Sequence, residues 1–259
     1  DGGSGTTNNF SATANWSPSS APLLLGLSTS DLVFASALRT SPNAEAAYQV
    51  NSITFAVNAA SFNITGAATL TLNYSGITQN SPNTQTISAP LDIAASPNTS
   101  NWIISAGNLT VNGAVKLTND VLFLNVAANR TVTFSGAISG TGTFLSQNGG
   151  GRTVISNSVA SGVGLSVLQA TMEVATGGSA PGGATVNSNG TLLISGGTVA
   201  TTSLGANVEG RIELAPGTHR SSTLNLGGAP AQRRFSSPGA RSSPQRSTSA
   251  IPPVPGTST

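Results

Sequence analysis

The residues able to carry out chemistry are few and widely separated. The chain has a single histidine, His219, and no cysteine. A Ser-His-acid triad would have to use His219 with Glu209 or Glu213, and no Gly-x-Ser-x-Gly turn is available to hold a serine nucleophile. A zinc site needs several His, Cys or clustered carboxylates. We therefore expect no catalytic residue, no metal ligand and no cofactor, and we predict that the chain is not an enzyme.

One carboxylate pair has a suggestive spacing. In the repeat described below, Glu173 and Glu213 lie on outward positions two coils apart, ~9.6 Å at the strand spacing of a β-sheet. That distance is at the upper edge of the range for inverting glycosidases. Leu193 lies between them, no third acid is near, and a flat outward face has no cleft to raise a pKa. We interpret both carboxylates as solubilising charges.

Two further groups offer possible ligand contacts. Gly149-Gly150-Gly151-Arg152 resembles an anion-binding loop, but it lacks a Lys-Ser/Thr ending and a following helix, so we interpret it as a turn between coils. Trp16, Trp102 and Tyr74 are the candidates for stacking against a sugar ring, with Tyr48 as a fourth aromatic. Since only 5% of the residues are aromatic, packing in the core or in a cap is the alternative for all four.

The charge distribution excludes several classes of protein. Charged residues make up 7% of the chain, against about 25% in ordinary soluble domains, which argues against coiled coils and helical bundles. The sequence before Arg220 has five cationic residues and all eight acidic residues of the chain, whereas the sequence from Arg220 onward has five arginines and no acid. The body is therefore weakly acidic, and we expect no specific recognition of nucleic acid.

Short segments of apolar, usually polar, apolar residues recur about every 20 residues, separated by Gly, Asn and Ser. This period predicts an all-β parallel β-helix, a solenoid of about nine coils. A β-sandwich is the rival, but its units of about 8–12 residues do not explain the spacing. The third residues of the segments should form one inward aliphatic stack: Phe55, Leu72, Ile93, Val111, Phe134, Ile155, Val174, Ile194 and Leu214. The preceding residues should form one outward, mostly polar row: Thr54, Thr71, Asp92, Thr110, Thr133, Val154, Glu173, Leu193 and Glu213.

Three regions follow from this period. Residues 1–50 lack it, contain the one plausible helical stretch, Asn43 to Tyr48, and are expected to cap the open end of the solenoid. Residues 51–228 hold the β-helix repeats. Residues 229–259 are rich in Pro, Ser and Arg, which predicts a disordered tail.

Several motifs resemble one known family. These segments are Asp1-Gly2-Gly3, Asn8-Asn9-Phe10-Ser11-Ala12-Thr13-Ala14-Asn15-Trp16, Asp31-Leu32-Val33-Phe34, Asn51-Ser52-Ile53-Thr54-Phe55, Thr69-Leu70-Thr71-Leu72-Asn73, Asn83-Thr84-Gln85-Thr86-Ile87, Leu109-Thr110-Val111-Asn112-Gly113, and Phe134-Ser135-Gly136-Ala137-Ile138-Ser139-Gly140-Thr141-Gly142. Through them the chain resembles proteins built from bacterial autotransporter-associated β-strand repeats. The similarity extends from about residue 1 to 160 and weakens to composition and period through residue 228.

The resemblance implies a right-handed β-helix of the passenger type, secreted or held at the cell surface. We therefore expect a noncatalytic structural or adhesive segment whose partners are surface glycans or neighbouring surface proteins. Contact with an outer membrane is expected only through segments that this chain lacks. The alternative is a degenerate or incomplete carbohydrate-active β-helix, related to polysaccharide lyases or hydrolases.

Overall fold

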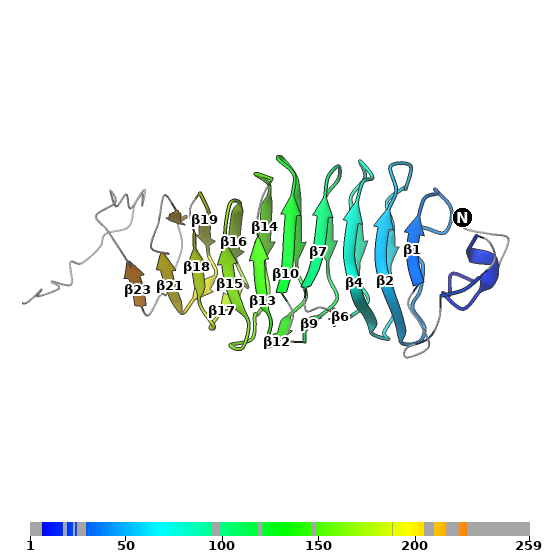
Figure 1. Ribbon diagram of the computed structural model, residues 1–259, viewed down its shortest axis with the longest axis horizontal. Helices are drawn as coiled ribbons and strands as arrows, with labels where there is room; N and C mark the ends of the chain where they lie inside the picture. Colours follow the sequence, from blue (N-terminus) through cyan, green and yellow to red (C-terminus); the bar gives the residue numbers. More distant parts are fainter. Residues whose placement is uncertain are drawn as a thin grey trace, which may run out of the picture.

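The computed structural model describes residues 7–17, 20–22, 24, 30–94, 99–118, 121–146, 149–187, 189–204, 210–215 and 223–226. In this part of the chain parallel strands wind into a β-solenoid of about eight turns, and the 3-10 turn η1 (Thr13–Asn15) is the one helical element. Figure 1 shows the strands side by side along a rod. The predicted all-β solenoid is confirmed, with about eight turns in place of nine.

One side of the rod is an eight-stranded parallel sheet that contributes one strand to each turn. We call it the eight-stranded face. Each strand between the two ends of this sheet pairs in register with the strand one turn earlier and the strand one turn later. In order along the rod the strands are β3 (Asn63–Ile64), β5 (Gln85–Ile87), β8 (Leu109–Val111), β11 (Thr131–Phe134), β14 (Arg152–Ile155), β16 (Thr171–Ala175), β19 (Thr191–Ser195) and β22 (Arg211–Leu214).

The remaining strands form two more rows. A thirteen-stranded sheet contains both, because the long strand β4 (Leu70–Gln79) pairs with β6 near its beginning and with β7 at its end. The longer row holds β1 (Ser30–Phe34), β2 (Tyr48–Phe55), β4, β7 (Thr99–Ile104), β10 (Val121–Val126), β13 (Thr143–Ser146), β15 (Gly164–Val167), β18 (Ala184–Val186), β21 (Thr201–Leu204) and β23 (Thr223–Leu226). The shorter row holds β6 (Leu91–Ile93), β9 (Val115–Leu117) and β12 (Ile138–Gly140), followed along the rod by the separate pair β17 (Ser179–Ala180) and β20 (Thr198–Val199).

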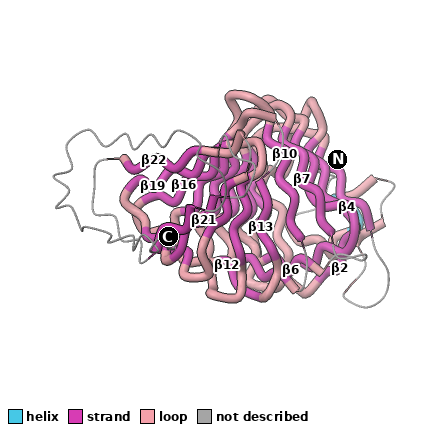
Figure 2. The backbone as a smooth tube through the Cα atoms, turned by 60° about the vertical axis from the view of Figure 1, so that its left-hand side comes forward, coloured by secondary structure: helices cyan, strands magenta, loops and turns pink. Residues whose placement is uncertain are grey.

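The strands form because their residues alternate between core and solvent. In β11, Val132 and Phe134 are fully buried, whereas Thr131 and Thr133 are partly exposed. β-Branched and aromatic side chains pack well on such a half-buried pleated surface. Figure 2 shows the strands stacked turn upon turn, with loops joining the rows. One continuous hydrophobic core fills the rod from the N-terminal turns to Val199.

The predicted inward stack is confirmed over its last six residues and wrong over its first three. Val111, Phe134 and Ile155 are partners on adjacent strands of the eight-stranded face. Leu72 and Ile93 pair with each other in the thirteen-stranded sheet, and Phe55 lies in a third line of that sheet. All three are buried, but none of them lies on the eight-stranded face. The stack on the eight-stranded face consists of Ile64, Ile87, Val111, Phe134, Ile155, Val174, Ile194 and Leu214.

The outward row divides in the same way. Thr110, Thr133, Val154, Glu173, Leu193 and Glu213 are register partners along the eight-stranded face, as predicted. Thr54, Thr71 and Asp92 lie in the thirteen-stranded sheet.

Glycine allows the turns to stack closely after the eight-stranded face. A Cβ atom at Gly136 would lie 2.0 Å from the carbonyl oxygen of Gly113 in the preceding turn, and one at Gly113 would lie 2.0 Å from the carbonyl oxygen of Ala89. No side chain fits at such distances. The corner therefore requires glycine in successive turns.

The N-terminal region joins the solenoid earlier than the predicted boundary at residue 50. β1 pairs in parallel with β2, so the ladder already includes Ser30–Phe34. The stretch from Asn43 to Tyr48 is not a helix, because Asn43 forms parallel bridges with Asn9 and Thr65 and Tyr48 begins β2. The backbone N–H and C=O groups of this stretch are needed for hydrogen bonds to neighbouring turns, and a helix would use them internally instead. The predicted tail, residues 229–259, lies outside the described residues.

Candidate functional site

For two of the three aromatic residues predicted to contact a ligand, Trp102 and Tyr74, the structure describes no exposed side-chain surface. Trp102 has no exposed surface, and its ring stacks on that of Phe134 with centroids 5.8 Å apart. Core packing is therefore its role. The backbone of Tyr74 lies in β4, while its side chain is outside the described part of the structure.

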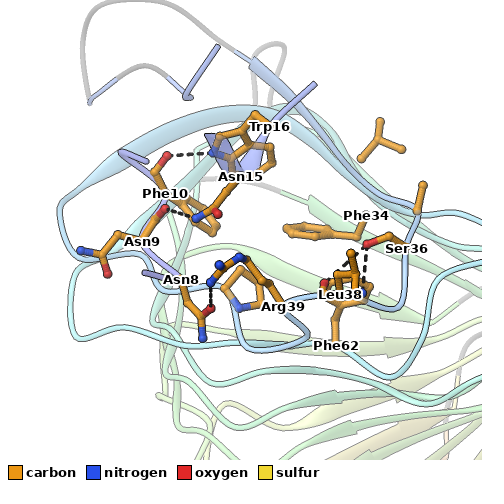
Figure 3. A pocket seen from close by; sticks show the side chains of 13 residues that line it. Asn8, Asn9, Phe10, Asn15, Trp16, Phe34, Ser36, Leu38, Arg39 and Phe62 are labelled. Carbon is orange, nitrogen blue, oxygen red and sulfur yellow. Dashed lines mark hydrogen bonds between the residues drawn. The ribbon is translucent and has the colours of Figure 1, made fainter. Parts of the chain in front are cut away.

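Trp16 is the predicted aromatic that lines a hollow. Its ring meets Phe10 edge-on at 5.3 Å and lies 6.0 Å from Phe34, and its indole N–H donates to the Phe10 carbonyl at 2.8 Å. Figure 3 shows these rings around the hollow, with Phe62 and Arg39 on its other side. The Arg39 guanidinium donates to the Asn8 side-chain oxygen and to the Thr7 carbonyl, both at 3.1 Å.

The hollow beside Trp16 is small. Its volume is about 30 Å³, room for about two water molecules. A sugar ring does not fit. We therefore interpret Trp16 as part of a packed N-terminal cap, in which its ring covers Phe10 and Phe34 at the open end of the rod.

Glu45 fastens this cap to the first turns. Its carboxylate accepts hydrogen bonds from the backbone N–H groups of Phe10 and Ser11, each at 3.0 Å, and from the Tyr48 hydroxyl at 2.8 Å. Burial alone would raise the pKa of Glu45, but the hydrogen bonds outweigh it and hold the pKa below the ordinary 4.5. Burial, together with the neighbouring carboxylate, raises the pKa of Tyr48 to about 12. The contacts of Glu45 with Phe10 and Ser11 were not predicted from the sequence, because they join residues more than 30 positions apart.

The predicted placement of Glu173 and Glu213 is confirmed, with Leu193 between them in register. Each carboxylate is held by an arginine on the same face. Arg152 pairs with Glu173, which also accepts a hydrogen bond from the Ser195 hydroxyl, and Arg211 pairs with Glu213 at 2.7 Å. Carboxylates fixed in ion pairs are poorly suited to donate or accept a proton in a glycosidase reaction.

Another charged pair lies on the shorter row. Asp92 and Lys116 are register partners on β6 and β9, and their charged atoms are 3.1 Å apart. Thr118 also donates its hydroxyl to Asp92 at 3.0 Å. The spacing of 24 residues between Asp92 and Lys116 is one turn of the solenoid, a pairing that the sequence could have suggested.

The glycine-rich segment is a turn between coils. Gly149 and Gly150 have φ angles of 99° and 69°, and they connect β13 to β14. The Gly151 N–H donates to the Val126 carbonyl at 3.0 Å, so it is not available to an anion. Arg152, the first residue of β14, points to the outward face.

No group of three or more His, Cys, Asp or Glu residues lies close enough to hold a metal ion within the described ranges. The same residues include no helix of the length and apolarity needed to cross a membrane. The triad considered from the sequence is not placed, because His219 and Glu209 lie outside these ranges.

No protein-family model, curated protein or solved structure matches the chain.

Proposed function

We propose that this chain is a noncatalytic structural and adhesive segment that is displayed outside the cell, as a rigid part of a passenger-type β-helix. The observation that carries the proposal is the uninterrupted in-register ladder of the eight-stranded face, from β3 to β22. Such a ladder holds its outward side chains in rows at a spacing of ~4.8 Å. Rows of this kind suit repeated contacts with a polymer or with a neighbouring protein.

The ion pairs on the same face support a noncatalytic role. Glu173 and Glu213 are the carboxylates whose spacing permits hydrolysis, and both are paired with arginine. The eight-stranded face thus has charged groups suited to contact and solubility, without a free acid-base pair at this position.

A panel of polysaccharides assayed for new reducing ends tests the noncatalytic role. We expect no turnover by the wild-type chain. Turnover that disappears in Glu173→Gln or Glu213→Gln would replace the proposal with a carbohydrate-active β-helix. Binding without turnover would support an adhesive role.

The proposed location needs a separate test. Protease added to intact cells that make the protein should degrade it, while a cytoplasmic marker stays intact. Full protection of the chain until the cells are lysed would contradict display outside the cell.

A further inference from the structure

A second hollow lies on the eight-stranded face, away from the N-terminal cap. It is a shallow depression of about 500 Å³ that is largely open to solvent. The loops before β11 and β14 border it, and the outward side of the next two strands forms its floor. Its lining residues are Asn129, Arg130, Thr131, Gly150, Gly151, Arg152, Thr171 and Leu193.

Two arginines start successive turns beside this hollow. The Arg152 N–H donates to the Arg130 carbonyl at 3.0 Å, so the two residues are neighbours across the ladder. Arg130 is partly exposed, and among the described residues its guanidinium has no hydrogen-bond or ion-pair partner. Its charge is therefore available to a ligand.

Arg152 is held in place by the carboxylate of Glu173. The Glu173 side chain is 9% exposed and pairs with one terminal nitrogen of Arg152, whose own side chain is 44% exposed. A guanidinium has five N–H donors, so the remaining donors of Arg152 are free to face solvent. Glu173 balances the charge of Arg152, and Arg130, which has no ion pair among the described residues, leaves a net positive charge at the opening of the hollow.

The rest of the lining suits a sugar ring. Leu193 gives an apolar surface within the lining, and Thr131 and Thr171 add hydroxyl groups on the flanking outward positions. Sugar rings have apolar faces and hydroxyl edges, so Leu193 and the threonines match both kinds of surface. Arginine binds carboxylate and sulfate groups strongly because its planar fork makes paired, charge-assisted hydrogen bonds.

We infer that this hollow binds an acidic sugar unit of a polysaccharide, with its carboxylate or sulfate group at Arg130 and Arg152 and its ring over Leu193. The inference rests on the proposed adhesive function and names its ligand class. Glu173 is then a positioning residue that orients Arg152.

The test measures binding of the full chain to immobilised polygalacturonate, dextran sulfate and neutral dextran. Wild type is expected to bind one or both acidic polymers and to ignore neutral dextran. The polygalacturonate and dextran sulfate arms show whether the recognised group is a carboxylate or a sulfate. Arg130→Gln and Arg152→Gln should each weaken binding about tenfold, the loss of one charge-assisted contact. Leu193→Ser should weaken binding without changing the charge.

Two controls separate the hollow from general attraction to positive charge. Arg211→Gln removes an arginine that starts β22 on the same face, outside the hollow, and the double change Arg233→Gln/Arg234→Gln removes charge from the basic C-terminal sequence. Both should leave affinity within about twofold. Equal losses in these controls and in Arg130→Gln would overturn the inference.

Folding and function are distinguished within the same set of experiments. Arg152→Gln leaves Glu173 without its ion pair and risks a loss of stability, so Arg130→Gln, which breaks no ion pair, is the decisive variant. If the wild-type chain binds neither acidic polymer, or binds neutral dextran equally well, the inference is overturned. The structural role of the rod is unaffected by that result. Turnover of any polymer overturns the proposed noncatalytic function instead.

Discussion

At the scale of single residues, a few charged side chains hold distant parts of the chain together, in the N-terminal cap and on the eight-stranded face. Glu45 joins three donors from two segments of chain, and Arg152 and Glu173 join adjacent turns. Neither group is distinguished by its local sequence. Glu45 meets its partners because the N-terminal segment folds back onto the first turns, and Arg152 meets Glu173 because the winding of the chain brings residues about one turn apart side by side.

The carboxylate of Glu45 should make the stability of the cap depend on pH. Its pKa in the folded chain is below 4.5, so its stabilisation is present above that pH and is lost as the pH falls through the lowered pKa. Glu45→Gln should lower the free energy of unfolding by no more than about 1 kcal/mol at pH 7, since the residue is exposed and solvent screens its charge. Urea unfolding of both proteins at pH 7 and at acidic pH measures this difference.

The control for that experiment is Tyr48→Phe, which removes one donor and keeps the carboxylate. It should keep most of the pH dependence, whereas Glu45→Gln should reduce it. Identical pH dependence in wild type and Glu45→Gln would contradict the assigned role of the carboxylate.

At the scale of elements, the stack on the eight-stranded face should govern stability. Phe134 is fully buried and contacts both Trp102 and Phe144, with ring centroids 5.8 Å and 5.0 Å away. Phe134→Ala should lower the free energy of unfolding by about 3–5 kcal/mol, because it removes a large side chain and leaves a cavity. The neighbouring outward change Thr133→Ala should cost less than about 0.5 kcal/mol. Chemical denaturation compares the two, and similar losses would argue against the inward assignment.

The glycine corner allows an independent test of turn stacking. Gly136→Ala places a methyl group against the Gly113 carbonyl of the preceding turn, so we expect a loss of about 1–3 kcal/mol, as for other overpacking changes. Thermal unfolding with Ser135→Ala as the control measures it. A Gly136→Ala protein as stable as wild type would mean that the turns are farther apart.

The sequence predicted nine strand segments correctly, but it did not predict the other strands or the row to which each segment belongs. All nine predicted segments lie in strands, and Val111 to Leu214 share one stack. Each turn also carries similar apolar pairs on two other rows, so a period near 20 residues fits a residue on any row. Ile64 and Ile87 were missed, and Leu72 and Ile93 were assigned in their place, for this reason.

The candidate sites depended even more on three-dimensional structure. The sequence placed Glu173 and Glu213 correctly on one row, because position along a strand alternates with period two. It could not show that arginines neutralise them, or that Arg130 and Arg152 flank a hollow. Those contacts depend on loop shape and side-chain direction, which a period does not encode.

For the molecule as a whole, the open end of the ladder is the point of weakness. Phe10 and Trp16 cover the first turns, next to the edge strand β1. A variant without residues 1–17 should expose this apolar end and associate with itself, since uncovered edge strands pair with other chains. Light scattering across a range of concentrations measures the association. A variant that stays monomeric at all concentrations would show that the cap does not protect the edge.

The in-register stacking of equivalent turns has a consequence for how such a chain evolves. Each turn offers the next one the same hydrogen-bonding edge, so an in-frame duplication of about 20 codons would add a turn that meets matching neighbours on both sides. Variants of different length would keep the same cap and the same charged pairs. The length of the rod would then change by ~4.8 Å for each duplicated unit.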